Sequence, residues 1–318
     1  MKNDVHDRDQ QGLVNVAFQG EHGAFSEDAA RRLFAKAIQT LPCRSFEDLF
    51  DSVTSGKADC AVVPIENTLA GSVHKNYDLL LQHQLTILAE INLRIVHNLI
   101  ALRGSLLSQI KRVYSHPVAL AQCERFLRRH NEMEASAAYD TAGSVKMIVE
   151  AGRVDEAAIA GAAAAQFYDA EVLLEGIEDN KKNFTRFLVL ATAQNAQFVA
   201  AQLTADSQNQ PRKTSLVFRI SNRPGALFRA LAVFALRDID LLKIESRPIE
   251  GRPWEYSFYL DIAGDSADPN IQRATGHLQE MTESVRVLGS YPGSEPSPGL
   301  AGDPVGQTTV HQIEKEMQ

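Results

Sequence analysis

The stretch TILAEINLRIVHNLIAL, residues 86–102, decides the fold of the first part of the chain. It is long, rich in β-forming residues and free of an internal helix signal. We expect it to carry the chain out of one lobe and into another. A return crossing is predicted near residues 171–178. Two lobes joined by crossing strands are expected to hold a cleft between them.

On both sides of this stretch, short apolar runs alternate with helical segments. Residues 13–18 and 60–63 read as strands, while residues 45–54 and 117–130 read as helices. Such alternation is typical of an α/β architecture with mostly parallel strands. The pattern continues to about Leu190, so the first domain is expected to end there.

The C-terminal part has a different order of elements. Residues 193–212 lose periodicity and read as a linker. The region that follows, 213–290, shows strands and helices in the order βαββαβ, which predicts a small ferredoxin-like module. Residues 291–318 are rich in Pro, Gly and Ser and are expected to be a disordered tail.

The composition excludes several classes of protein. The 318-residue chain is 44% hydrophobic and has a formal net charge of -8, without a basic patch, which argues against nucleic-acid binding. No apolar run is long enough to span a membrane, and the first eleven residues lack a signal peptide's apolar region. The three cysteines and nine histidines have no ligand spacing, which predicts reduced thiols, no metal and a cytoplasmic protein.

Polar side chains gather where strands end and helices begin. In GEHGAFS, residues 20–26, Ser26 is expected to cap a helix whose free N–H groups could hold an anion, although an ordinary loop explains the spacing better. In PIENTLAGS, residues 64–72, Glu66, Asn67 and Thr68 follow a buried strand. Ligands of α/β sheets collect at that end, but a helix-capping cluster explains these residues equally well.

Three more stretches share this position. YSHP, residues 114–117, precedes a predicted helix that bears Gln122, and Thr141 is a natural N-cap before another helix. In NKKNFTRFLVL, residues 180–190, Thr185 and Arg186 open a buried strand. Hydroxyls and helix N-termini of this kind suit a small, multiply charged anion, but the residues alone name no reaction.

Four of these stretches, in this order, resemble the prephenate dehydratase family: FQGEHGAFSEDAA, AVVPIENTLAGSV, YSHPVALAQC and NFTRFLVL. The similarity runs from about Leu13 to Leu190. Beyond the linker, NRPGALFRAL and KIESRPIEGRPWEYSFYLDI resemble the ACT regulatory domain that follows the catalytic part in this family. One departure is Val118, which stands where the family often has glutamine.

The resemblance implies a two-lobed, periplasmic-binding-protein-like catalytic domain over residues 13–192. Its lobes are expected to be 13–90 with 172–192, and 91–171, followed by the ACT domain. The implied enzyme is a monofunctional decarboxylating hydro-lyase that turns prephenate into phenylpyruvate, water and carbon dioxide. Aromatisation drives the reaction, so no cofactor is expected.

The resemblance also implies roles for individual residues. Thr185 is the catalytic residue, and Arg186 is expected to favour its action as a hydrogen-bond donor or to bind a substrate carboxylate. Glu66 is expected to orient neighbours or to pair with Arg186. The implied substrate-binding residues are Ser26, Glu66, Asn67, Thr68, Ser115, Gln122, Thr141 and Arg186.

Control by L-phenylalanine is the regulatory expectation, with a homodimer or homotetramer formed through paired ACT domains. The implied effector site comprises Asn222, Gly225, Ala226, Leu227, Glu245, Ser246, Arg247 and Pro248. Two alternatives remain open at this point. An arogenate dehydratase would use the same residues on the amino analogue, and a two-lobed amino-acid sensor would bind without catalysis.

Overall fold

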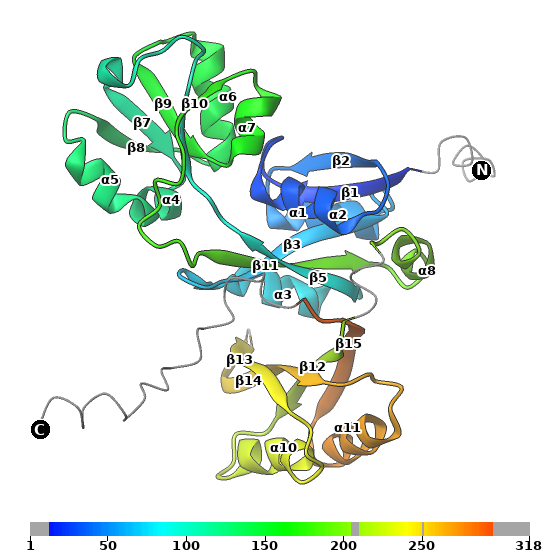
Figure 1. Cartoon of the computed structure of the whole chain (residues 1–318). Coiled ribbons are helices and arrows are strands. Elements are labelled where there is room, and N and C mark those ends of the chain that lie inside the picture. Colours follow the sequence, from blue (N-terminus) through cyan, green and yellow to red (C-terminus); the bar gives the residue numbers. More distant parts are fainter. Residues whose placement is uncertain (1–12, 205–209, 250, 295–318) are drawn as a thin grey trace, which may run out of the picture.

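The computed structural model describes residues 13–204, 210–249 and 251–294. Two lobes stand above a C-terminal domain, and the first lobe lies in the middle (Figure 1). Among the described residues, none of the helices is both long and apolar enough to cross a membrane.

The first lobe is built on a six-stranded sheet. Its strands run in the order β2 (Ile38–Cys43), β1 (Val14–Gln19), β3 (Cys60–Asn67), β11 (Phe184–Ala191) and β5 (Thr86–Arg94), with the short β4 (Gly71–Ser72) on β3. The helices are α1 (Phe25–Leu33), α2 (Phe46–Thr54), α3 (His74–Gln82) and α8 (Ala196–Ala200). Strand β11 is antiparallel to both of its neighbours, so the returning chain is inserted into the middle of the sheet.

The second lobe has a five-stranded sheet. The order is β10 (Glu171–Leu174), β6 (Asn98–Ala101), β9 (Glu156–Ala160), β7 (Arg112–Ser115) and β8 (Glu134–Ala137). The helices are η2 (Leu107–Gln109), α4 (Pro117–Gln122), α5 (Glu124–Arg129), α6 (Thr141–Ala151) and α7 (Ala162–Phe167). The single helix expected over 117–130 is therefore divided at Cys123.

The two crossings lie slightly away from their expected positions. Strand β5 stays in the first sheet as far as Arg94, and the chain enters the second sheet at Asn98. Strand β10 pairs with β6, so residues 172–174 belong to the second lobe and not the first. The boundaries at 90 and 172 are corrected accordingly, because strand pairing is a long-range choice that local sequence does not specify.

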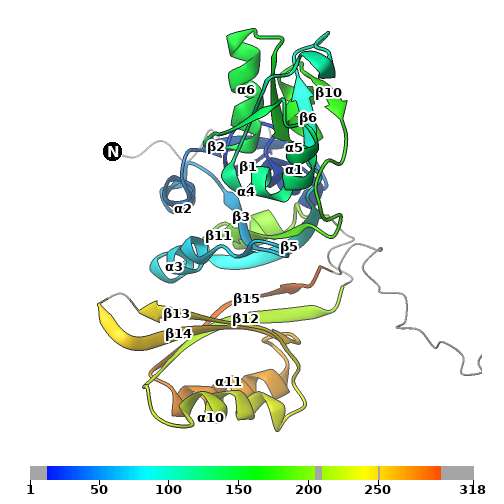
Figure 2. The same ribbon diagram turned by 90° about the vertical axis from the view of Figure 1, so that its left-hand side faces the viewer.

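The C-terminal domain has the ferredoxin-like fold that the sequence predicts. Its elements are β12 (Arg212–Ile220), α10 (Ala226–Ala235), β13 (Leu241–Ile249), β14 (Arg252–Ala263), α11 (Pro269–Met281) and β15 (Ser284–Pro292). The antiparallel sheet has the order β13-β14-β12-β15. Both helices cover one face of this sheet, and the other face lies against the first lobe (Figure 2).

Two boundaries around this domain also change. The expected linker, 193–212, contains helix α8, and residues 205–209 lie outside the described part of the chain. Strand β15 runs through Tyr291, which is fully buried, so the start of the tail at residue 291 is wrong. Its large aromatic ring is buried in a core that forms only when the C-terminal domain packs against the first lobe. The rest of the expected tail, 295–318, lies outside the described residues.

One hydrophobic core runs through the contact between the C-terminal domain and the first lobe. Val217, Tyr259 and Leu288 from the C-terminal sheet join Leu188 and Leu190 from β11 in a single buried cluster. The hydroxyl of Tyr259 also donates to the backbone oxygen of Tyr77, at 2.5 Å. Strand β11 therefore contacts the C-terminal domain through one of its faces.

Candidate active site

The register of β3 and β11 places four of the candidate residues. Thr185 lies opposite Asn67, and Arg186 lies opposite Glu66. Because successive strand residues point to opposite faces, the pair Asn67–Thr185 shares one face and the pair Glu66–Arg186 shares the other. The first pair faces the second lobe, and the second pair faces the C-terminal domain.

Thr185 is 9% exposed, and its hydroxyl is held by one amide. Asn67 Nδ2 donates to Thr185 Oγ1 at 2.9 Å, and it also reaches Asn183 Oδ1 at 2.8 Å. The carboxamide oxygen of Asn67 accepts the backbone N–H groups of Leu69 and Ala70, which fixes the orientation of its amide. Because Oγ1 accepts this hydrogen bond, the hydroxyl proton of Thr185 is directed towards another acceptor.

The same chain of hydrogen bonds continues into the second lobe. Asn183 Nδ2 donates to Gln122 Oε1 at 2.9 Å, and His97 Nε2 lies 2.8 Å from the same oxygen. With that oxygen as acceptor, His97 carries its proton on Nε2. Burial lowers the pKa of His97 and favours the neutral ring. Gln122 thereby links the second lobe to Thr185 through the oriented amides of Asn183 and Asn67.

Thr68 lies immediately after the end of β3. It is exposed, its hydroxyl donates to the backbone oxygen of Lys182, and it accepts the backbone N–H of Phe184, both at 3.0 Å. These bonds hold the start of β11 against the end of β3. Thr68 thus fixes the backbone one residue before Thr185.

Ser26 and Thr141 lie at two helix starts on either side of the lobe junction. Neither is the N-cap that was expected: Ala24 precedes α1, and the side chain of Asp140 caps α6 by accepting from the N–H of Gly143. Asp140 also accepts the backbone N–H of Glu21 from the first lobe at 2.9 Å. The two helix starts are therefore joined by a hydrogen bond between the lobes.

Close backbone contact supports this junction. Gly23 has a φ of +83°, and a Cβ built there would lie 2.5 Å from the Cα of Ala164 in the second lobe. A side chain at this position would push the lobes apart. Lys146 adds an ion pair with Glu21 at 3.2 Å.

Ser115 lies deeper than expected. Its hydroxyl donates to the backbone oxygen of Ile159 at 2.6 Å, and the residue is fully buried at the end of β7. In this structure Ser115 ties two strands of the second lobe together.

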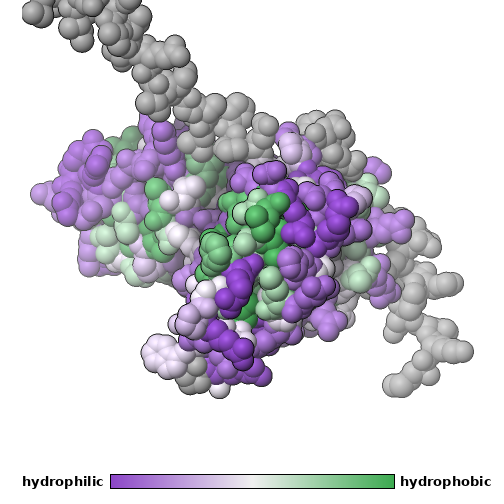
Figure 3. All heavy atoms as spheres, turned by 90° about the horizontal axis from the view of Figure 1, so that it is seen from below, coloured by the Kyte–Doolittle hydropathy of each residue, from purple (hydrophilic) through white to green (hydrophobic). Residues whose placement is uncertain are grey.

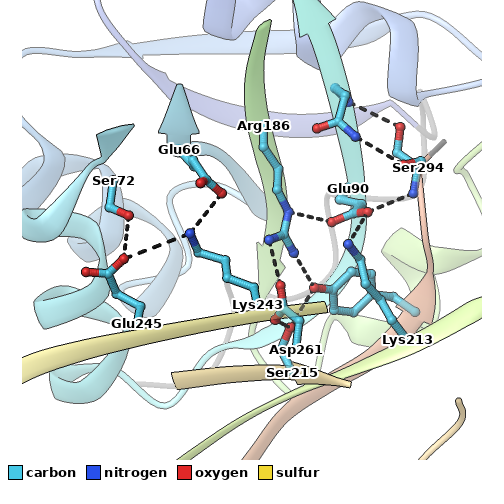
Figure 4. A network of polar contacts seen from close by, with 12 residues as sticks. Glu66, Ser72, Glu90, Arg186, Lys213, Ser215, Lys243, Glu245, Asp261 and Ser294 are labelled. Carbon is cyan, nitrogen blue, oxygen red and sulfur yellow. Dashed lines mark hydrogen bonds and ion pairs between the residues drawn. The ribbon is translucent and has the colours of Figure 1, made fainter. Parts of the chain in front are cut away.

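Arg186 does not lie beside the Thr185 hydroxyl. Its guanidinium donates to Glu90 at 2.6 Å, to Asp261 at 2.6 Å and to the hydroxyl of Tyr291 at 3.0 Å, and the last two belong to the C-terminal domain (Figure 4). Burial alone lowers the pKa of Arg186, but Asp261, Tyr291 and Glu90 together raise it well above its ordinary value. The expectation that Arg186 favours Thr185 as a hydrogen-bond donor is therefore wrong, because neighbouring side chains of a strand point to opposite faces.

Glu66 also points towards the C-terminal domain. It forms an ion pair with Lys243 Nζ of β13 at 2.9 Å (Figure 4). The expected pairing of Glu66 with Arg186 is wrong: the two residues are cross-strand neighbours, but the positive partner of Glu66 comes from the C-terminal domain.

The expected effector segment on β13 is divided between two faces. Glu245 accepts a hydrogen bond from Ser72 at 2.6 Å, and Arg247 forms two hydrogen bonds with Asp78, at 2.8 and 3.0 Å. Ser246 and Pro248 alternate with them and are exposed on the opposite face. Two residues of the segment, Glu245 and Arg247, therefore contact the first lobe.

A pocket of about 220 Å³ lies on the side of the C-terminal sheet to which Ser246 and Pro248 point. Its lining comprises Ile220, Ser221, Asn222, Arg223, Ala226, Leu227, Trp254, Tyr256 and Phe258. Three expected effector residues, Asn222, Ala226 and Leu227, belong to this lining. Gly225 has a positive φ of 75° immediately before α10 and sets the turn that opens the pocket.

Three residues of the site were not identified from the sequence. Asn183 and His97 extend the hydrogen-bond chain, and Asp140 joins the lobes. A signal was present for the first two, since each is a polar residue within or beside an apolar run. In the described ranges, no cluster of three or more His, Cys, Asp or Glu side chains could hold a metal ion.

Comparison with known proteins gives two matching family models. The model described as prephenate dehydratase matches residues 16–195, and the model of the ACT domain matches residues 214–275.

Individual proteins agree with these models. Arogenate dehydratase 2 of Petunia hybrida is 43% identical over 293 residues, which cover 88% of this chain and 72% of that protein. A prephenate dehydratase from Arthrobacter aurescens, solved in complex with L-Phe, has a TM-score of 0.77 and 32% identity over 88% of this chain and 90% of its own. A structure described as GqqA, a novel type of quorum quenching acylase, has a TM-score of 0.76 and 33% identity over 89% of this chain and 98% of its own.

Proposed function

Because the chain belongs to the prephenate dehydratase family of lyases and carries an ACT domain, we propose that it converts prephenate into phenylpyruvate, water and carbon dioxide. The observation that carries the proposal is the 2.9 Å hydrogen bond from Asn67 Nδ2 to Thr185 Oγ1. It leaves the Thr185 hydroxyl oriented as a donor on the side of the strand that faces the second lobe.

In the proposed reaction, the bond between the ring and its carboxylate breaks and releases carbon dioxide. The electron pair moves into the ring, and the bond from the ring carbon to its hydroxyl group breaks. Thr185 donates a hydrogen bond to the departing oxygen, which leaves as water after taking up one proton in total. A threonine hydroxyl is a very weak acid, so orientation by Asn67 replaces acidity as the contribution of this residue.

Binding of the two carboxylates is assigned to the junction between the lobes. Ser26 and Thr141 lie at the starts of α1 and α6, where backbone N–H groups attract negative charge. Gln122, held by His97 and Asn183, is proposed to line the cleft from the second lobe. The substrate would then contact both lobes at once.

The test is an assay of the purified chain with prephenate, followed by the absorbance of phenylpyruvate. Thr185→Ala should lower kcat by about 10²- to 10⁴-fold, with little change in KM. Thr185→Ser is the matched control, because it keeps the hydroxyl and should retain much more turnover. Turnover in Thr185→Ala equal to that of the parent chain would contradict the role.

Arogenate is the second candidate substrate. The similarity to the Petunia enzyme favours it, and the two substrates differ only in an amino or a keto group. Parallel assays of both substrates, compared by kcat/KM, distinguish the two activities. A higher value for arogenate would replace the proposed substrate while leaving the role of Thr185 in place.

L-Phenylalanine is the proposed effector. Its ring would enter the apolar part of the 220 Å³ pocket, beside Leu227 and Phe258. The solved Arthrobacter relative, described as a complex with L-Phe, supports this choice. Calorimetry with the parent chain tests it, and absence of binding at millimolar concentration would contradict it.

A homodimer or homotetramer is proposed from the surface of the same domain. Figure 3 views this domain from below and shows apolar side chains gathered among polar ones. Phe228, Leu236 and Trp254 are each more than three-quarters exposed, and the edge strand β13 exposes half of Leu242. Pairing of two such domains would cover this surface. Light scattering of the purified chain gives the assembly state, and a monomer at all concentrations would refute it.

A further inference from the structure

Strand β13 touches the catalytic lobe with alternate residues. Lys243 pairs with Glu66 at 2.9 Å, Glu245 binds Ser72 at 2.6 Å, and Arg247 binds Asp78. The regular spacing of these contacts follows from the period of two in a strand. Residues 243–247 of β13 therefore contact the first lobe through one face, and Figure 4 shows the contacts of Lys243 and Glu245.

The other face of β13 borders the proposed effector pocket. Ser246 lies opposite Phe258 of β14, and Pro248 lies opposite Tyr256. Both aromatic residues line the pocket. Because directly opposed residues in a sheet share a face, Ser246 and Pro248 lie beside two rings that a ligand in the pocket would contact.

In the first lobe, the partner of Lys243 is Glu66, which lies next to the residue that binds the Thr185 hydroxyl. Glu66 precedes Asn67, whose amide holds the Thr185 hydroxyl. Glu66 and Asn67 are joined by one peptide unit at the end of β3. From Lys243 to the Thr185 hydroxyl, the path comprises the ion pair with Glu66, one peptide unit of β3 and the hydrogen bond from Asn67.

Resting on the function proposed above, we infer that Lys243 and Glu66 are positioning residues and that their ion pair transmits effector binding to Thr185. Occupation of the pocket shifts β13 and changes the ion pair between Lys243 and Glu66. This change alters the orientation of the Asn67 amide. The coupling acts within one chain.

The experiment compares kcat/KM with and without saturating L-phenylalanine. In Lys243→Gln, the ratio of the two values should move about 1.5- to 5-fold closer to one, as expected for loss of a partly exposed ion pair. Lys243→Arg keeps the charge and should keep most of the response. Lys75→Gln is the matched control, since it removes another Lys–Glu pair, with Glu47 at 2.6 Å, on the exposed surface of the first lobe.

A double variant separates transmission from a merely structural role. If Lys243 acts through Glu66, Glu66→Gln with Lys243→Gln should reduce the response no further than the stronger single variant. An unchanged response in Lys243→Gln, or single effects that multiply in the double variant, would overturn the inference. Failure of the proposed function looks different: the parent chain itself would lack turnover of both substrates or would not bind L-phenylalanine in calorimetry, and the inference would fall with it.

Discussion

The substitution Asp261→Asn tests whether the C-terminal domain supports the strand that bears Thr185. Asp261 accepts from Arg186 at 2.6 Å and from the hydroxyl of Ser215 at 2.5 Å. Asparagine has nearly the same shape, so packing and the bond to Ser215 can persist. The substitution therefore removes mainly a charge.

The magnitude follows from the charges of the buried cluster. Arg186 and Lys213 are balanced by Glu90 and Asp261, and Lys213 lies 2.5 Å from Glu90 (Figure 4). Loss of one carboxylate leaves an uncompensated positive charge, which costs about 3–5 kcal/mol at a buried site. For folding units of this size, the midpoint of thermal unfolding should fall by roughly 6–20 °C. We expect kcat to fall as well, since displacement of a catalytic group by about 1 Å can cost 10²-fold.

The pH dependence has a definite sign. Burial alone raises the pKa of Asp261, but Arg186, Lys213 and the hydrogen bond from Ser215 bring it below its ordinary value. A carboxylate with a lowered pKa stabilises the fold above the unfolded pKa of about 4, and this stability is lost as the pH falls through the lowered pKa. Asp261→Asn should therefore lose the most stability near neutral pH and the least in strong acid.

The assay is calorimetric unfolding together with steady-state kinetics of the same preparations. Glu124→Gln is the control, because it removes an exposed pair with Arg128 and should cause no measurable shift. Arg186→Gln combined with Asp261→Asn restores the charge balance and should recover part of the lost stability. If Asp261→Asn unfolds at the temperature of the control, the assigned support is refuted.

Two further substitutions test the hydrogen-bond chain at Thr185. Asn67→Asp replaces the donor to Thr185 with an acceptor that would capture the hydroxyl proton, so kcat should fall by about 10²-fold or more with a smaller change in KM, whereas a KM effect alone would contradict the donor role. His97→Gln tests the lowered pKa of His97: in the parent chain, denaturant midpoints should decline as the pH falls below about 6.5, and this decline should be smaller in the variant. Equal pH slopes in the two proteins would exclude His97 as the source.

Much of the architecture could be predicted from local sequence patterns. The alternation of apolar runs and helical segments indicated the α/β lobes, and the order βαββαβ indicated the C-terminal fold. Asn67 could be selected as a polar side chain at the end of a buried strand, whereas the role of Thr185 came from the family resemblance. Domain edges were less predictable, since β10 and Tyr291 take their places only through pairing and packing with distant segments.

The pair Thr185–Arg186 shows what the sequence by itself determined and what only the tertiary structure decided. Sequence places a hydroxyl and a positive charge at the start of a buried strand, and the period of two in a strand already separates their side chains. Only the packing of the lobes and the C-terminal domain decided what each side chain contacts. Thr185 contacts Asn67 on the side of the second lobe, and Arg186 contacts Asp261 and Tyr291 on the other side. The physical reason is that a buried charge needs partners, and these partners lie 75 and 105 residues away in the sequence.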